Sequence, residues 1–123
     1  GESYAEDSNI LENVEDSARA WLSLTDSGKY AESWKNASSL LKSGEGESNW
    51  IKKIKAVRSP LGSVGSRHIA TAHSAETLPD MPDGEYVLVQ FYTSFEHKVL
   101  ALETVTTVKE QDETWRISEY LIK

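Results

Sequence analysis

The chain has 123 residues, a length that fits one domain able to bury its own core. It contains no cysteine, which excludes disulfides, thiolate metal sites and cysteine nucleophiles. The formal net charge of -7 argues against binding nucleic acid or an anionic membrane through bulk electrostatics. The apolar runs are strand-sized, and none approaches the roughly 20 residues that a membrane-spanning helix needs.

The first half of the chain has helical periodicity. Residues 1–9 are polar and acidic, and we expect a flexible N-terminal segment there, followed by one domain over residues 10–123. Apolar residues spaced three and four apart then predict three helices, over about 11–26, 30–41 and 50–61. Glycine and proline residues lie at the ends of these stretches, where they stop helices.

From Ser66 onward the chain becomes rich in Thr, Val, Tyr and Phe, with alternating polarity. This pattern predicts strands over about 67–75, 85–95, 98–109 and 114–122. Helices followed by an antiparallel meander indicate an α+β fold, with N-terminal helices packed on a curved four-stranded sheet. A twisted sheet curling around a long helix forms a cone, and its open end is where a pocket would lie.

The alternation also predicts which side chains face the helices. We expect the inward face to include Val87, Val89, Phe91, Leu100 and Leu102. The opposite face would then carry an aromatic patch made of Tyr86, Leu88, Tyr92, Val105 and Tyr120. His68 and His73 are five residues apart and would point to opposite faces of a regular strand, which argues against a metal site.

The chain has a large number of tryptophans for its length, and all four lie on apolar stripes: Trp21, Trp34, Trp50 and Trp115. They pack in the core, or they line an aromatic cavity. Arg58 and Arg67 flank the crossing from helices to sheet. Arg58 suits the negative end of a helix dipole, and either arginine suits an anion at a pocket mouth.

Glu103 lies between Ala101 and Val105 on the same face of a strand. With a two-residue hairpin tip at Glu96-His97, it would lie opposite Gln90. A carboxylate is rarely buried without a partner, so Glu103 is either exposed or paired. We favour a pair with Arg58 or Arg67, because arginine forms bidentate bonds to carboxylates.

These arguments give one candidate set of ligand-binding residues. Its members are aromatic residues and the charged groups near the expected pocket mouth: Trp50, Arg58, Arg67, Phe91, Glu103 and Trp115. No catalytic residue, metal ligand or cofactor is assigned. The carboxylates of residues 80–85 lack the spacing of a calcium loop, and the glycines of residues 62–66 lack the ending of a phosphate loop.

An ordered series of short motifs resembles a bacterial family known as domain of unknown function 4019. The series comprises Ala20-Trp21-Leu22, Gly28-Lys29-Tyr30-Ala31-Glu32-Ser33-Trp34, Trp50, Arg58-Ser59-Pro60-Leu61-Gly62, Ser66-Arg67, Pro82-Asp83-Gly84-Glu85-Tyr86, Phe91, Thr93, Phe95, Lys98, Glu103-Thr104-Val105-Thr106, Trp115-Arg116 and Tyr120. The resemblance implies a cystatin-like or NTF2-like cone in an exported bacterial protein, periplasmic, secreted or lipid-anchored. It implies no activity. Glu119 departs from the small residue usual there, which leaves the facing of the last strand open and allows for a bulge.

Our leading hypothesis is a non-enzymatic domain that binds a small molecule or peptide in a partly apolar cone. One alternative is a homodimeric interaction or structural module that uses the outer sheet face. Another is an isomerase-like or dehydratase-like enzyme, which would need a pocket carboxylate or histidine with a perturbed pKa. A leader ahead of Gly1, absent from this sequence, is expected from the resemblance to exported proteins.

Overall fold

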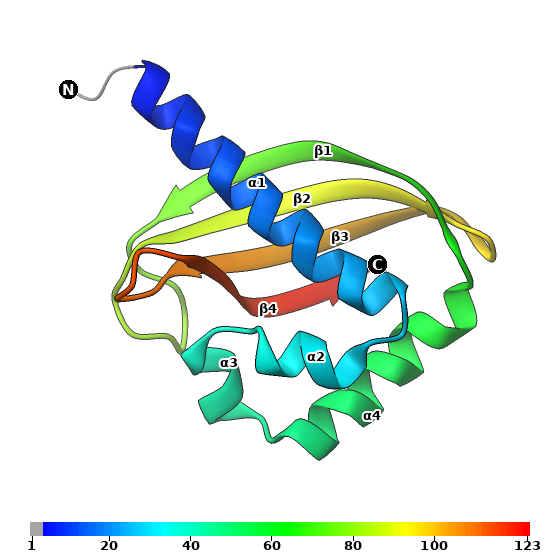
Figure 1. Ribbon diagram of the computed structural model, residues 1–123. Coiled ribbons are helices and arrows are strands. Elements are labelled where there is room, and N and C mark those ends of the chain that lie inside the picture. The colour runs from blue at the N-terminus through cyan, green and yellow to red at the C-terminus, as the bar shows by residue number, and fades with distance from the viewer. Residues whose placement is uncertain (1–3) are drawn as a thin grey trace.

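The computed structural model describes residues 4–123 as helices followed by one sheet. The helices all lie on one face of the sheet, and the longest crosses it diagonally (Figure 1). The elements are α1 (Tyr4–Asp26), α2 (Tyr30–Lys35), α3 (Ser39–Gly44), α4 (Glu47–Arg58), the 3-10 turn η1 (Ser59–Leu61), β1 (Val64–Ala75), β2 (Tyr86–Phe95), β3 (Lys98–Lys109) and β4 (Trp115–Ile122).

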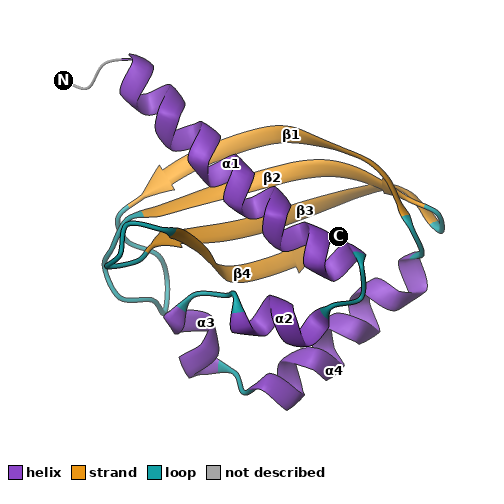
Figure 2. Ribbon diagram, viewed as in Figure 1, coloured by secondary structure: helices purple, strands orange, loops and turns teal. Residues whose placement is uncertain are grey.

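The sheet is an open antiparallel meander in the order β1-β2-β3-β4. Figure 2 shows the segregation of helices and strands that confirms the predicted α+β fold. The strand over residues 98–109 has the predicted bounds, and β1 begins three residues before its predicted start. Sequence alternation therefore located the strands well.

The helices differ more from the prediction. α1 begins at Tyr4, so part of the segment expected to be flexible is helical, and the flexibility itself stays a prediction. The helix predicted over 30–41 is divided into α2 and α3. Ser38 causes the division, because its side chain caps Leu41 N at 3.1 Å while its backbone N–H donates to Ile117 O of β4 at 2.8 Å.

The predicted inward positions of Leu100 and Leu102 are wrong. The register passes from Phe95↔Lys98 to Thr93↔Ala101, which leaves one extra residue in β3. A bulge of this kind reverses the facing of every later side chain on its strand. Leu100 is consequently 63% exposed and Leu102 is half-buried, whereas Val87, Val89 and Phe91 of β2 are buried as predicted.

The predicted outer aromatic patch is also largely wrong. Val105 faces inward because of the β3 bulge. Tyr120 faces inward because of a second register shift beside Ser118, so the last strand does contain a bulge, which the departure at Glu119 had left open. Tyr86 is covered by the preceding loop, where its hydroxyl donates to Pro82 O at 2.5 Å. Only Leu88 and Tyr92 of this patch remain at least partly exposed.

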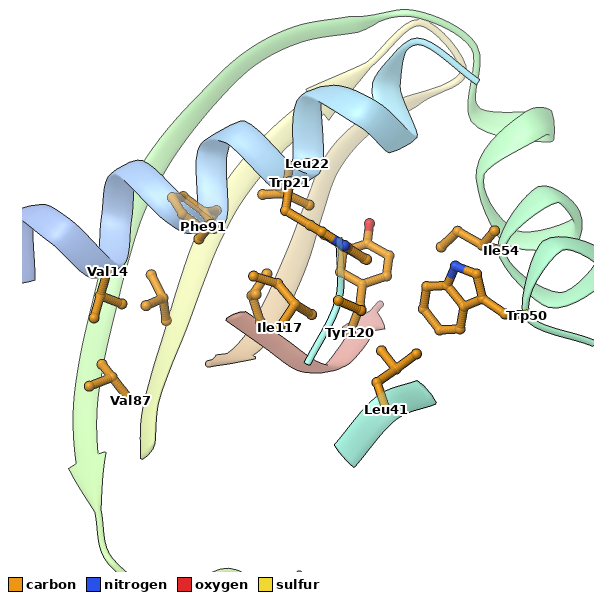
Figure 3. Packing of buried hydrophobic residues seen from close by; sticks show 14 residues of the cluster. Val14, Trp21, Leu22, Leu41, Trp50, Ile54, Val87, Phe91, Ile117 and Tyr120 are labelled. Carbon is orange, nitrogen blue, oxygen red and sulfur yellow. The ribbon is translucent and has the colours of Figure 1, made fainter. Parts of the chain in front are cut away.

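The core fills the space between the helices and the sheet. Side chains from α1, α4 and three strands meet there, with Trp21 and Trp50 near its centre (Figure 3). The Trp21 ring centroid lies 6.0 Å from that of Trp50 and 5.6 Å from that of Tyr120. Both indoles bond to Ser33, Trp21 to its carbonyl at 2.8 Å and Trp50 to its hydroxyl at 2.9 Å. Core packing is thus what the structure shows for these two tryptophans.

Candidate functional site

Four charged side chains converge at one end of the core. They are the last residue of α1, the last residue of α4, and one residue each from β1 and β3: Asp26, Arg58, Arg67 and Glu103. Arg67 bridges the two carboxylates. It donates to Asp26 at 2.7 and 3.0 Å and to Glu103 at 2.7 and 3.3 Å. We call these four residues the ion cluster.

Glu103 is fully buried and its carboxylate is well satisfied. Besides the bidentate bond from Arg67, it accepts a hydrogen bond from Thr93 Oγ1 at 2.6 Å and another from the Tyr120 hydroxyl. The predicted pairing of Glu103 with an arginine is therefore confirmed, and the partner is Arg67. Its expected position opposite Gln90 is wrong, because the β3 bulge places it opposite Phe91.

Arg58 reaches the cluster through Asp26. It donates to Asp26 Oδ1 at 2.8 Å and to Thr25 Oγ1 at 2.7 Å, and its guanidinium lies over the Phe95 ring, 4.7 Å from the centroid. It is the last residue of α4, as the helix-dipole argument expected. Its Nε is buried and has no partner among the described residues.

The electrostatics of the cluster favour its charged form. Burial raises the pKa of Asp26. The hydrogen bonds and positive charges of Arg67 and Arg58 lower it by a larger amount, so the pKa lies below its ordinary value. Burial lowers the pKa of Arg67, and the two carboxylates outweigh this and raise it above its ordinary value. Burial and the neighbouring Glu103 raise the pKa of Tyr120, which keeps its proton on the hydroxyl.

The ion cluster has two positive and two negative side chains, all largely shielded from solvent. Each carboxylate already receives bonds from arginine, and the tyrosine donates its only proton inward. A substrate would have to displace these internal partners. The arrangement joins α1, α4, β1, β3 and β4 at one point, which is a structural role.

Open clefts lie elsewhere on the molecule. One has a volume of about 410 Å³ and lies between α1, the residue 36 turn and the start of β4. A second of about 400 Å³ lies near the sheet end, beneath the N-terminal half of α1. Trp115 lines both, so one partly buried indole separates two clefts. Two smaller grooves pass Trp50: one of about 210 Å³ between α3, α4 and β4, and one of about 180 Å³ between α4 and β4.

The structure divides the six predicted ligand-binding residues into three groups. Arg58, Arg67 and Glu103 come together in the ion cluster, and Phe91 lies in the core. None of these four lines any of the clefts just described. Trp50 lines the two smaller grooves and Trp115 the two larger clefts. A ligand-binding role for these residues stays a prediction.

Sequence reasoning missed Asp26 and Tyr120 as neighbours of Glu103. Sequence analysis assigns no role to Asp26, and the alternation predicts an outer-face position for Tyr120. Asp26 and Arg67 are separated by 41 residues, so local spacing gave no signal. Sequence reasoning also does not single out Arg116, which adjoins Trp115 and lines the cleft between α1 and β4.

The two β1 histidines also differ from expectation. His68 pairs with Tyr92 and His73 with Leu88, so both point to the outer face, because a register shift at Ala70 adds a residue between them. Among the side chains that the structure describes, those of residues 9–123, no group of three or more potential metal ligands comes together. No helix of residues 4–123 is long and apolar enough to span a bilayer.

Comparison with known proteins gives one result. A search among curated proteins found no match. Residues 17–120 match a family described as "Protein of unknown function (DUF4019)". This match runs from the middle of α1 to the inward-facing tyrosine of β4, and so includes all the residues of the ion cluster. The chain therefore belongs to the DUF4019 family.

Proposed function

We propose that this domain is a non-enzymatic binding module that holds a small aromatic anion in the 410 Å³ cleft between α1 and β4. The observation that carries the proposal is the lining of that cleft. Trp21 and Trp115 supply aromatic surface and Arg116 supplies a cation beside it. We call this space the α1–β4 cleft.

The size and walls of the α1–β4 cleft suit such a ligand. Small-molecule sites typically have volumes of roughly 300–1,000 Å³ and combine apolar walls with a few polar groups. Here Ala20, Leu24 and Ile117 extend the apolar surface, and the polar lining is short: Ser17, Asn36 and Thr114. The Trp21 ring is held in place because its indole N–H bonds to Ser33 O at 2.8 Å.

Arg116 gives the cleft its preference for an anion. One of its terminal nitrogens donates to Asn36 O at 3.2 Å, which anchors the guanidinium at the cleft. A guanidinium has five N–H donors, so others remain to bind a carboxylate or sulfonate. It is the charged residue among those lining the cleft.

The same lining supports a binding role over an enzymatic one. Acid–base catalysis needs a positioned carboxylate, histidine or similar group within reach of the substrate. The residues that line the α1–β4 cleft include no Asp, Glu or His. Asp26 and Glu103 are buried carboxylates, but both are paired with Arg67 in the ion cluster and do not line this cleft.

Two fluorescent dyes test the proposal. Anilinonaphthalene sulfonate is an aromatic anion, and N-phenylnaphthylamine has the same rings without the sulfonate. We expect the folded wild-type protein to bind the sulfonate more tightly, because only the sulfonate engages Arg116. A charge-assisted bond should make the Kd of the sulfonate about tenfold lower than that of the uncharged dye, and Arg116→Gln should remove most of this difference. Trp115→Ala should weaken the binding of both dyes.

Lys52→Gln is the matched control, because it removes a positive charge from an exposed residue of α4. It should leave the affinities for both dyes unchanged. Circular dichroism of each variant verifies that it is folded, since the sulfonate dye also binds partly unfolded protein. Equal affinities of wild type and Arg116→Gln for the sulfonate would refute the anion site. Unchanged binding of both dyes by Trp115→Ala would refute the cleft itself.

A further inference from the structure

The second cleft, of about 400 Å³, shares only Trp115 with the α1–β4 cleft. It lies at the end of the sheet where β1 and β3 end and β2 and β4 begin (Figure 1). Residues at all four of these strand ends line it, and Ile10 of α1 forms part of its wall. Its volume lies within the range of roughly 300–1,000 Å³ that small-molecule sites have. We call this space the sheet-end cleft.

The sheet-end cleft has an acidic lining. Its charged residues are Glu76, Glu85 and Lys109, so two carboxylates stand against one ammonium group. Lys109 Nζ lies 3.7 Å from a Glu85 oxygen and 3.8 Å from a Glu113 oxygen, which is too far for a direct hydrogen bond. Over residues 9–123, Glu76 has no ion-pair partner. The lining therefore keeps a surplus of negative charge, opposite in sign to that of the α1–β4 cleft.

Trp115 supplies an aromatic wall beside these carboxylates. The indole N–H groups of the other three tryptophans donate to oxygens of the chain at 2.8 to 2.9 Å: Trp21, Trp34 and Trp50. Trp115 Nε1 has no such partner among the residues that the structure describes, and its side chain is only partly buried. Tryptophan attracts cations to its ring face more strongly than the other aromatic residues do. An accessible indole beside surplus negative charge favours an organic cation.

We propose that the sheet-end cleft binds a small alkylammonium ion. Glu76 and Glu85 supply the opposite charge, Trp115 supplies the aromatic face, and Ile10 and Val87 supply apolar surface for the alkyl groups. A metal ion needs several oxygen or nitrogen ligands, and no group of three or more such side chains gathers over residues 9–123. The site does not depend on the anion proposed for the α1–β4 cleft, because the two linings differ in every residue but Trp115.

Choline and dimethylbutanol test this proposal on the wild-type protein. The two molecules have the same shape and the same hydroxyl group, and only choline carries the ammonium charge. We expect choline to shift the NMR signals of the amides of residues 74–76 and 85–87 and of the Trp115 indole N–H. Its Kd should be at least about fivefold lower than that of dimethylbutanol, as expected for one cation–aromatic contact. Equal affinities, or shifts confined to other residues, would overturn the proposal.

Charge variants give a second test with two opposite expected directions. Replacing both carboxylates, Glu76→Gln with Glu85→Gln, should raise the Kd of choline at least about threefold, since both charges are partly exposed. Lys109→Gln should lower the Kd, because it removes the cation that competes with the ligand for Glu85. Partial unfolding does not produce tighter binding, so this result would identify an electrostatic cause. A Kd that the double variant leaves unchanged, or that Lys109→Gln raises, would overturn the proposal.

Two single variants are the matched controls. Glu119→Gln makes the same change at an exposed residue of β4 that does not line the sheet-end cleft, and it should leave the Kd of choline unchanged. Arg116→Gln should also leave it unchanged, which separates this site from the α1–β4 cleft. A failure of the sulfonate dye to bind would therefore not affect the result with choline.

Phosphatidylcholine vesicles present the same quaternary ammonium group on a lipid surface. The sheet-end cleft lies beneath the N-terminal half of α1, so we expect it to admit a free cation and not a headgroup held in a bilayer. The protein should then bind free choline and remain in the supernatant when the vesicles are sedimented. Sedimentation with the vesicles that free choline does not inhibit would overturn the proposal.

Discussion

The fully buried carboxylate of Glu103 is satisfied by three side chains, and Arg67 is satisfied by two carboxylates. Replacing an entire buried ion pair by apolar groups is often harmless, because the desolvation cost disappears with the charges. Removing a single partner is different, since the other charge stays buried. The ion cluster should therefore respond strongly to single substitutions.

Glu103→Ala should lower the free energy of unfolding by about 3–5 kcal/mol, because it leaves the Tyr120 hydroxyl without its acceptor and the two buried arginines with Asp26 as their one carboxylate. Urea unfolding monitored by tryptophan fluorescence measures this loss. Glu119→Ala, the same change at an exposed residue of the neighbouring strand, is the control and should alter stability by less than about 0.5 kcal/mol. Similar small effects for both would contradict the assigned role.

The stabilisation that Asp26 provides depends on pH. Its pKa is lowered in the folded protein, so its contribution to stability is complete above the ordinary value of 3.8 and is lost as the pH falls through the folded pKa. Asp26→Asn should cost about 1–3 kcal/mol at neutral pH, since two arginines lose a charged acceptor. It should also flatten the acid limb of the stability curve.

Urea unfolding at several pH values compares Asp26→Asn with wild type and with Asp16→Asn, which removes an exposed carboxylate from the same helix. Asp16→Asn should follow the wild-type curve closely. If Asp26→Asn loses as much stability on acidification as the wild type does, the cluster does not depend on the charge of Asp26.

At the scale of elements, the bulge in β3 decides which residues reach the core. It places Ala101, Glu103 and Val105 inward and Leu100 outward, against the pattern of hydrophobicity. A buried carboxylate takes the position that Leu102 would have had without the bulge. The ion cluster therefore depends on one extra residue in a hairpin.

Phe91→Ala should cost about 3–5 kcal/mol of unfolding free energy, because it empties a fully buried site. Leu100→Ala should cost less than about 1 kcal/mol, since Leu100 is mostly exposed. Thermal or urea unfolding of both variants under one condition gives the comparison. A larger loss for Leu100→Ala would mean that the β3 register without the bulge is the one formed in solution.

At the scale of the whole molecule, the helices cover one face of the sheet and leave one edge open. The ion cluster joins the ends of α1 and α4 to the sheet, while the N-terminal part of α1 extends beyond β1. This asymmetry separates three surfaces: the α1–β4 cleft, the outer sheet face and the β1 edge. The dye experiment addresses the first of these, because Arg116 lies on β4, at the opposite side of the sheet from β1.

The sequence by itself determined the order and type of the elements and the inward residues of β2, and it favoured an arginine partner for Glu103. Each depends on local periodicity or on the cost of burying one charge, which can be read from a short segment. The motifs in their order also indicated the family.

Only the tertiary structure decided the facing of β3 and β4, the choice of Arg67 over Arg58 as the partner of Glu103, and the place of Asp26 between them. A bulge reverses a period of two without changing composition, and the hairpin tip at Glu96-His97 lacks the residues that fix a tight turn. Asp26 and Arg67 meet only because α1 and β1 pack at the same end of the core. Contacts between residues so far apart in the chain follow from packing, and local pattern does not specify them.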